Sequence, residues 1–66
     1  MSNLYTNIAP VANLYKKASI KSEVVTQIIF GERFAIRGRS GKWLKIRIKE
    51  DGYKGYIKKK KLLFKY

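Results

Sequence analysis

The side chains that could do chemistry in this 66-residue chain are aromatic and basic. With no Cys and no His, the sequence offers neither the usual zinc ligands nor a Cys–His nucleophile pair. Glu50 and Asp51 are adjacent carboxylates, but Asp51-Gly52 is typical of a hairpin turn, so we interpret them as the turn and its solvated flank. The five glycines have turn or strand explanations, which excludes a phosphate-binding glycine loop. We therefore expect a binding protein, with no catalytic residue, no metal and no cofactor.

The aromatic candidates are Tyr15, Trp43 and Tyr56. From Trp43 onward apolar and basic residues alternate, which predicts a half-buried strand with Trp43, Lys45 and Arg47 on its outer face. Tyr56 falls on the partner strand of the same hairpin, and Tyr15 ends an earlier strand. Aromatic side chains left outside a core suit a shallow groove that takes an extended peptide. The alternative is that Trp43 lies flat over Lys45 or Arg47 as a cross-strand lid, with cation–π support.

Basic side chains surround this predicted groove and would pair with ligand carboxylates. Arg would do so through a bidentate fork, whereas Lys acts as a point charge. Arg39 and Lys42, on the preceding turn, would add to the same field. The predicted ligand-binding residues are therefore Tyr15, Trp43, Tyr56, Lys45, Arg47 and Lys54.

Positive charge is concentrated further in the run Lys58, Lys59, Lys60 and Lys61. Such a run is either a solvated face on a short helical turn or loop, or a patch that binds polyanions. Over the whole chain, 16 Lys and Arg against four acidic residues give a formal net charge of +12. That field attracts nucleic acid, anionic membranes or acidic wall polymers, although compositional bias and solubility would also explain it.

Five short strands are predicted, over residues 11–15, 24–30, 33–37, 43–48 and 53–57. Residues 1–8 show no hydrophobic periodicity, which predicts a flexible leader. Residues 16–23 are predicted to form a polar loop. Turns are expected at Gly31-Glu32, from Gly38 to Gly41 and at Asp51-Gly52, while Gly55 indicates a close backbone approach or a bend. A sheet this small manages its edges by curling into a partly closed barrel. The predicted core consists of Leu14, Val24, Ile28, Phe34, Ile36, Leu44, Ile46, Ile48, Ile57 and Leu62.

Two motifs are specific as a pair: the run from Thr26 to Glu32, Thr-Gln-Ile-Ile-Phe-Gly-Glu, and the run from Asp51 to Tyr56, Asp-Gly-Tyr-Lys-Gly-Tyr. Together with Ala9 to Tyr15 and Gly41 to Arg47, they extend over nearly the whole chain after its first eight residues. On these residues the chain resembles the bacterial SH3-like domains that stand in front of NlpC-type cell-wall peptidase domains. It departs from that pattern in its stronger positive charge and at Tyr56, where the family usually has Trp.

The resemblance implies an all-β fold, a small five-stranded SH3-like barrel over residues 9–64, with residues 65–66 as a tail. It also implies a non-catalytic module that recognises a peptidoglycan stem peptide or docks on an adjacent peptidase domain, since the family's catalytic residues lie in a following domain. A small nucleic-acid-binding barrel is the alternative, because basic residues interleaved with Tyr and Trp suit a single strand. With neither a signal peptide nor a membrane span in the sequence, we expect a cytoplasmic monomer, or an envelope protein if the chain is part of a longer exported one.

Overall fold

The computed structural model describes residues 4–61 and 64–65, which form one antiparallel sheet of seven strands. In chain order the elements are β1 (Tyr5–Asn7), β2 (Val11–Tyr15), β3 (Val24–Ile29), β4 (Arg33–Ser40), β5 (Trp43–Ile48), β6 (Lys54–Lys58), the 3-10 turn η1 (Lys59–Lys61) and β7 (Phe64–Lys65). Their order across the sheet is β3-β2-β6-β5-β4-β1-β7. Because β3 and β7 each have one neighbouring strand, the ladders among the described residues leave the sheet open at these two edges.

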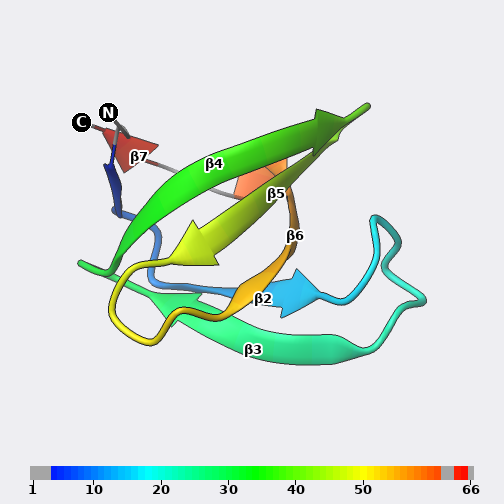
Figure 1. The fold of residues 1–66 in the computed structure, drawn as a ribbon, viewed down its shortest axis with the longest axis horizontal. Helices are drawn as coiled ribbons and strands as arrows, with labels where there is room; N and C mark the ends of the chain where they lie inside the picture. Colours follow the sequence, from blue (N-terminus) through cyan, green and yellow to red (C-terminus); the bar gives the residue numbers. More distant parts are fainter. Residues whose placement is uncertain (1–3, 62–63, 66) are drawn as a thin grey trace.

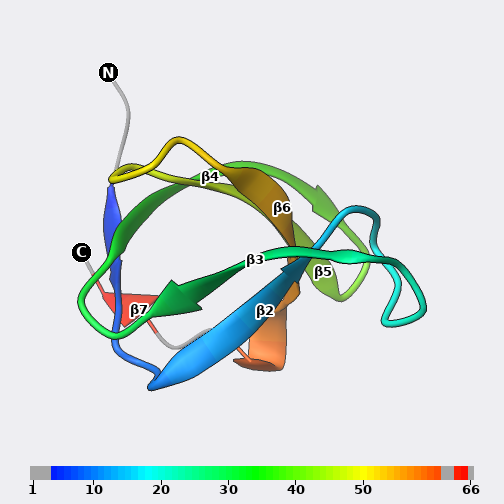
Figure 2. The same cartoon turned by 90° about the horizontal axis from the view of Figure 1, so that it is seen from below.

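The sheet curls over on itself, so that β4 and β5 lie across β2 and β3 with the core between them (Figure 1). Figure 2 shows this curl from below, with β2 and β3 crossing in front of the other strands. The alternation in β5 sends Leu44, Ile46 and Ile48 inward, each at most 2% exposed. The other buried apolar side chains are Ala9, Leu14, Ile28, Phe34 and Ile57. The all-β fold with period-2 burial is therefore confirmed.

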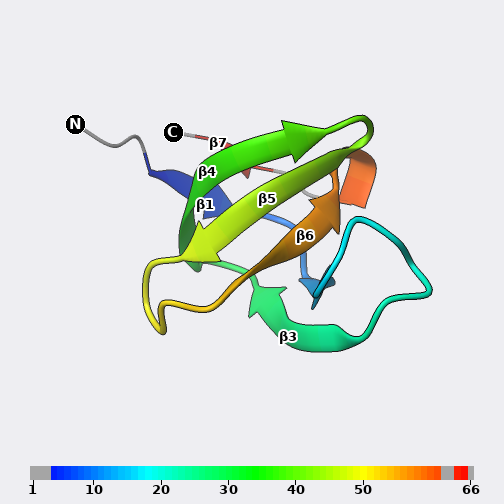
Figure 3. The same cartoon turned by 45° about the vertical axis from the view of Figure 1, so that its right-hand side comes forward.

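The predicted number of strands is too low by two short strands. The five expected strands are present as β2 to β6, and β1 and β7 add to them. β1 pairs with β4 on one side and with β7 on the other (Figure 3). The fold thus begins before residue 9, inside the segment predicted to be a leader, because three residues are too few to show a strand period.

Asn7 connects β1 to the turn between β3 and β4 through hydrogen bonds. The sequence did not predict this role of Asn7. Its side chain is fully buried. The Nδ2 atom donates hydrogen bonds to the carbonyl oxygens of Ala9 (3.1 Å) and Ile29 (2.9 Å), and Oδ1 accepts one from the Ala9 N–H (3.0 Å). The Asn7 backbone N–H donates to the Glu32 carbonyl (2.9 Å), while its carbonyl accepts from the Gly31 N–H (2.8 Å). These bonds offset the cost of burying a polar side chain.

β4 is longer than predicted. It continues through Gly38 to Ser40, where the sequence predicts a turn, and the turn itself consists of Gly41 and Lys42. A register shift at Arg37 interrupts the β4–β5 ladder next to Gly38. An isolated glycine inside a strand often marks such a bulge, so Gly38 belongs to a bulged strand and not to the turn.

The predicted core is confirmed except at Val24, while Leu62 lies outside the described residues. Val24 is 45% exposed, whereas its neighbour Val25 is partly buried against the core, as is Ile36. A register shift in the β2–β3 pair puts Val24 opposite Tyr15 on the outer face. The β-branched run in β3 does not alternate with polar residues, so its inward positions could not be read from the pattern.

Both glycine predictions in the β5–β6 hairpin are confirmed. Gly52 has a φ of 76°, and its N–H donates to the Ile48 carbonyl (2.8 Å) to close the turn. Gly55 is buried, and a Cβ built there would lie 2.8 Å from the Leu14 Cβ and 3.2 Å from the Tyr15 carbonyl oxygen. β6 therefore passes β2 at a separation that only glycine allows, which brings the outer side chains of the two strands together.

Candidate functional site

The three predicted aromatic residues meet on the outer face of β2, β6 and β5. Tyr15 and Tyr56 lie opposite each other where β2 pairs with β6. The rings of Tyr15 and Trp43 meet edge to face, with centroids 5.7 Å apart and an interplanar angle of 88°. All three side chains are half-buried. An edge-to-face pair contributes about 0.5–1.5 kcal/mol beyond its buried area, so the rings hold one another in place.

Two lysines lie over these rings. Lys45 Nζ is 5.9 Å from the centroid of the Tyr56 ring, and Lys58 Nζ is 5.9 Å from the centroid of the Trp43 ring. Each pair consists of opposite residues in the β5–β6 ladder, so strand register places the cation over the ring. The cation beside Trp43 is therefore Lys58, in place of the Lys45 or Arg47 that the lid hypothesis expects.

Arg47 and Lys54, the other two predicted ligand-binding residues, lie one row farther along the same face. They are opposite each other in the β5–β6 ladder, next to the hairpin turn, and both are exposed. Neither has a ring contact with the aromatic cluster among the described residues. The structure thus brings together Tyr15, Trp43, Tyr56 and Lys45, and leaves Arg47 and Lys54 at the margin.

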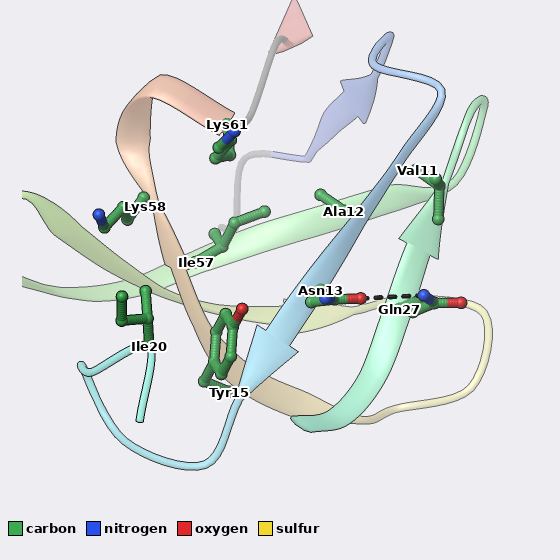
Figure 4. Close-up of a pocket in the computed structure, with 9 residues that line it drawn as sticks. All are labelled: Val11, Ala12, Asn13, Tyr15, Ile20, Gln27, Ile57, Lys58 and Lys61. Carbon is green, nitrogen blue, oxygen red and sulfur yellow. Dashed lines mark hydrogen bonds between the residues drawn. The ribbon is translucent and has the colours of Figure 1, made fainter. Parts of the chain in front are cut away.

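A groove of about 460 Å³ opens beside the aromatic cluster, between β2 and β6 (Figure 4). It exists because β2 and β6 are paired at Tyr15–Tyr56 and separate from each other beyond that point. Ile57 lies midway along the groove, with Tyr15 at one end and Lys61 at the other. We call it the β2–β6 groove; its lining residues are Val11, Ala12, Asn13, Tyr15, Ile20, Gln27, Ile57, Lys58 and Lys61.

The walls of the β2–β6 groove differ in chemistry. On the β2–β3 side, the Gln27 side-chain amide donates a hydrogen bond to Asn13 Oδ1 (2.9 Å), which orients two neutral polar groups. On the opposite side, Ile20 projects from the loop of residues 16–23 and is 62% exposed. That loop is cross-linked by its own hydrogen bonds, including one from the Lys16 N–H to the Glu23 carbonyl (2.8 Å). The groove therefore offers apolar, amide and cationic surfaces within one short span.

The lysine run is divided between two surfaces. Lys58 ends β6 and the next three lysines form η1. The predicted helical turn is therefore confirmed for these three lysines and wrong for Lys58, which is a strand residue. Lys61 lines the β2–β6 groove, Lys59 and Lys60 line a neighbouring hollow with Gly41 and Lys42, and Lys58 lines both. A 3-10 helix has about three residues per turn, so successive side chains point in different directions. Lys59 and Lys60 thus lie outside the β2–β6 groove, and Lys58 lies between the groove and the neighbouring hollow.

Sequence reasoning missed most of the neutral groove residues. Val11, Asn13 and Gln27 alternate outward along β2 and β3, but nothing in their types distinguishes a groove wall from an ordinary solvated face. Ile20 gave a usable signal, because it is the one large aliphatic residue in the polar stretch from residue 16 to residue 23. Ile57 was assigned to the core, and it also contributes to the groove.

The acidic groups near the hairpin turn are engaged away from the groove. Glu50 accepts hydrogen bonds from the Arg33 backbone N–H (3.1 Å) and Nε (3.3 Å). Burial raises the pKa of the Glu50 carboxyl, but hydrogen bonds from backbone N–H groups and the Arg33 guanidinium outweigh this effect, so the pKa lies below its ordinary value of 4.5.

Within residues 4–61 and 64–65, no group of three His, Cys, Asp or Glu side chains could hold a metal ion. In the same residues, no helix is long and apolar enough to cross a membrane.

Comparison with known proteins connects this fold with one family. The family model described as "Bacterial dipeptidyl-peptidase Sh3 domain" matches residues 14–62, which run from the end of β2 through β6 and include the aromatic cluster. Neither the curated proteins nor the solved structures contain a match.

Proposed function

We propose that this protein, which belongs to the bacterial dipeptidyl-peptidase SH3 domain family, is a non-catalytic module whose β2–β6 groove binds the stem peptide of peptidoglycan. The observation that carries this proposal is the groove itself. It combines an aromatic end at Tyr15, exposed aliphatic side chains at Val11 and Ile20 and two cations at Lys58 and Lys61. A short peptide that carries both apolar side chains and free carboxylates matches this arrangement.

The dimensions of the groove support a short ligand. Its volume of about 460 Å³ falls in the range of about 300–1,000 Å³ that is usual for small-ligand sites. The Asn13–Gln27 pair would supply amide groups to a peptide main chain, and the lysines would pair with carboxylates at its end. Lys58 also lies over Trp43, so a ligand that draws Lys58 away would change the surroundings of that ring.

The same surface would serve for docking on an adjacent NlpC-type peptidase domain. In that case the groove shapes the substrate site of the neighbouring domain, and the isolated module has little affinity for the peptide. Val11 at 51% and Ile20 at 62% exposure favour this variant, because two aliphatic side chains that line one groove gain from being covered together.

A nucleic-acid-binding module is the second candidate, favoured by the net charge of +12 and by lysines over the Trp43 and Tyr56 rings. The dependence of affinity on salt concentration distinguishes the two candidate functions. A protein that contacts Z phosphates of a single strand loses affinity with a log–log slope of about −0.7Z. Binding of a peptide with a few carboxylates would depend on salt only weakly.

Trp43 makes the proposal testable, because it is the single tryptophan and contacts Tyr15. Titration with a soluble muropeptide is expected to change Trp43 fluorescence in a saturable way. Tyr15→Ala should weaken binding about tenfold or more, since it removes the aromatic end of the groove. Tyr53→Ala is the matched control, because Tyr53 is 56% exposed and does not line the groove. Equal affinities for the two variants would contradict the proposal.

A further inference from the structure

Another pocket, smaller than the β2–β6 groove and separate from it, lies on the β4–β5 side of the molecule. It has a volume of about 260 Å³ and is lined by Leu4, Ala35, Arg37, Arg47 and Lys49. Its shape follows from strand register. Ala35 and Arg47 are opposite residues in the β4–β5 ladder, so the small Ala35 side chain leaves a hollow beside the long Arg47 side chain. Leu4 adds an apolar wall, because it immediately precedes β1, which pairs with β4.

Among the residues that the structure describes, three cations and no acidic side chain line this pocket. The nearby Glu50 is held by Arg33, and Asp51 accepts a hydrogen bond from the Tyr53 N–H (3.0 Å). In the described part of the chain, the side chains of Arg37, Arg47 and Lys49 have no hydrogen bond or ion pair. The pocket is therefore a concentration of uncompensated positive charge in a concave site, where field lines converge.

The choice of arginine at this pocket is itself informative. The chain contains 12 lysines and only four arginines, Arg33, Arg37, Arg39 and Arg47. Two of these four line the pocket. Composition and solubility would be served equally by lysine, whereas a planar guanidinium presents paired donors that match two oxygens of one anion. Arg37 lies at the β4 bulge, a feature that often re-aims a side chain.

We infer that this pocket binds a phosphate group, either as free phosphate or as a phosphomonoester with an apolar organic part. A phosphate group offers three or more acceptor oxygens and up to about two negative charges. Two guanidinium forks and one ammonium match that ligand better than they match a carboxylate, which has two oxygens and one charge. The organic part of a monoester would contact Leu4. This site is separate from the β2–β6 groove, so it does not depend on the function proposed above.

The test is an NMR titration of the ¹⁵N-labelled chain with inorganic phosphate and with phenyl phosphate, each against chloride at equal ionic strength. Saturable shifts are expected at Ala35, Arg37 and Lys49. Tighter binding of phenyl phosphate would identify an organic monoester, and equal binding would identify free phosphate. Shifts spread over the η1 lysines and the loop of residues 16–23, following ionic strength alone, would overturn the inference.

A matched pair of variants completes the experiment. Arg37→Gln should weaken phosphate binding about tenfold or more, because it removes charge-assisted hydrogen bonds. Arg37→Lys keeps the charge but loses the bidentate guanidinium, so its affinity for phosphate should lie between those of the unmodified chain and Arg37→Gln. Arg39→Gln changes an exposed arginine of the same strand that does not line the pocket, and it should have no effect. Equal losses for Arg37→Gln and Arg39→Gln would show general charge attraction and would contradict a built site.

Discussion

The two halves of the molecule differ sharply in charge. No charged side chain occurs in residues 4–15 and 24–31, which contain β1, β2 and β3. Residues 33–61, which contain β4 to β6 and η1, carry 12 of the 16 basic side chains: Arg33, Arg37, Arg39, Lys42, Lys45, Arg47, Lys49, Lys54, Lys58, Lys59, Lys60 and Lys61. The β2–β6 groove lies at the boundary, with a neutral wall from β2 and a basic wall from β6.

This contrast in charge indicates that polar side chains have different roles in the two halves. In the neutral half, polar side chains serve the structure, as Asn7 does through three side-chain hydrogen bonds. In the basic half, most polar side chains stay exposed and only Arg33 has an ion pair among the described residues. Removal of a buried polar side chain from the neutral half should therefore act mainly on stability, and removal of an exposed basic side chain should act mainly on binding.

The largest effect on stability is expected from Asn7→Ala. It leaves the Ala9 N–H and the Ala9 and Ile29 carbonyls without their side-chain partner. The Ile29 carbonyl is only partly buried and still accepts a hydrogen bond from the Glu32 N–H (3.2 Å), whereas both Ala9 groups are buried. Each buried group left unsatisfied costs about 1–3 kcal/mol, so the free energy of unfolding should fall by about 2–6 kcal/mol. Asn13→Ala is the control within the same half, because its bond to Gln27 is exposed and should matter by less than about 1 kcal/mol. Urea unfolding that gives equal losses would contradict the role of Asn7.

Gly55→Ala should come next, because it tests the close passage of the two halves. Its Cβ would clash with Leu14 and push β6 away from β2. We expect a loss of about 1–3 kcal/mol, as for other overpacked cores. Gly38→Ala is the matched control, because its Cβ would lie 3.9 Å from the Lys45 Cβ, an ordinary contact. Thermal unfolding of both variants measures the difference, and a Gly55→Ala midpoint equal to that of Gly38→Ala would rule out a tight passage.

A smaller effect, on binding alone, should separate the lysines of η1. Lys61→Gln removes a cation that lines the β2–β6 groove, and Lys60→Gln removes one that does not. We expect Lys61→Gln to weaken muropeptide binding about twofold to fivefold and Lys60→Gln to leave it unchanged, since exposed ion pairs contribute up to about 1 kcal/mol. Calorimetric titration distinguishes the two. Equal weakening would mean that the run acts as one diffuse patch.

The smallest effect concerns the pH dependence of stability at Glu50. Its pKa is lowered in the folded state, so the carboxylate contributes stability that is present above the ordinary value of 4.5 and is lost as pH falls through the lowered pKa. Glu50→Gln should remove this contribution, so that the melting temperature of the variant depends less on pH below 4.5 than that of the unmodified chain. The Glu50 side chain is 40% exposed, so the change should be slight. A steeper acid dependence in the variant would contradict the assignment.

Much of the basic half could be predicted from sequence, because β5 alternates and the hairpin turn carries Asp51-Gly52. The same alternation placed Trp43 and Lys45 on the outer face. The neutral half was harder, because β1 is too short to show a period and the β-branched run of β3 does not alternate. Those limits explain both the missed strand β1 and the wrong assignment of Val24 to the core.

The candidate site divides in the same way. The aromatic cluster follows from residue type and face, and the structure brings its three members together. The β2–β6 groove depends on where two strands of distant sequence stop pairing, and no local pattern encodes that point. The pocket lined by Arg37, Arg47 and Lys49 likewise depends on Ala35 lying opposite Arg47, which is a consequence of β4–β5 register.

The most direct test of the account is an NMR titration of the isotope-labelled chain with a soluble muropeptide that carries the full stem peptide, at low and at moderate salt. The account predicts saturable shifts that survive the added salt and are confined to the β2–β6 groove, above all at Tyr15, Ile57 and Lys58. Absence of shifts, or shifts at Lys42, Lys59 and Lys60 that vanish with salt, would contradict recognition of the peptide by this module.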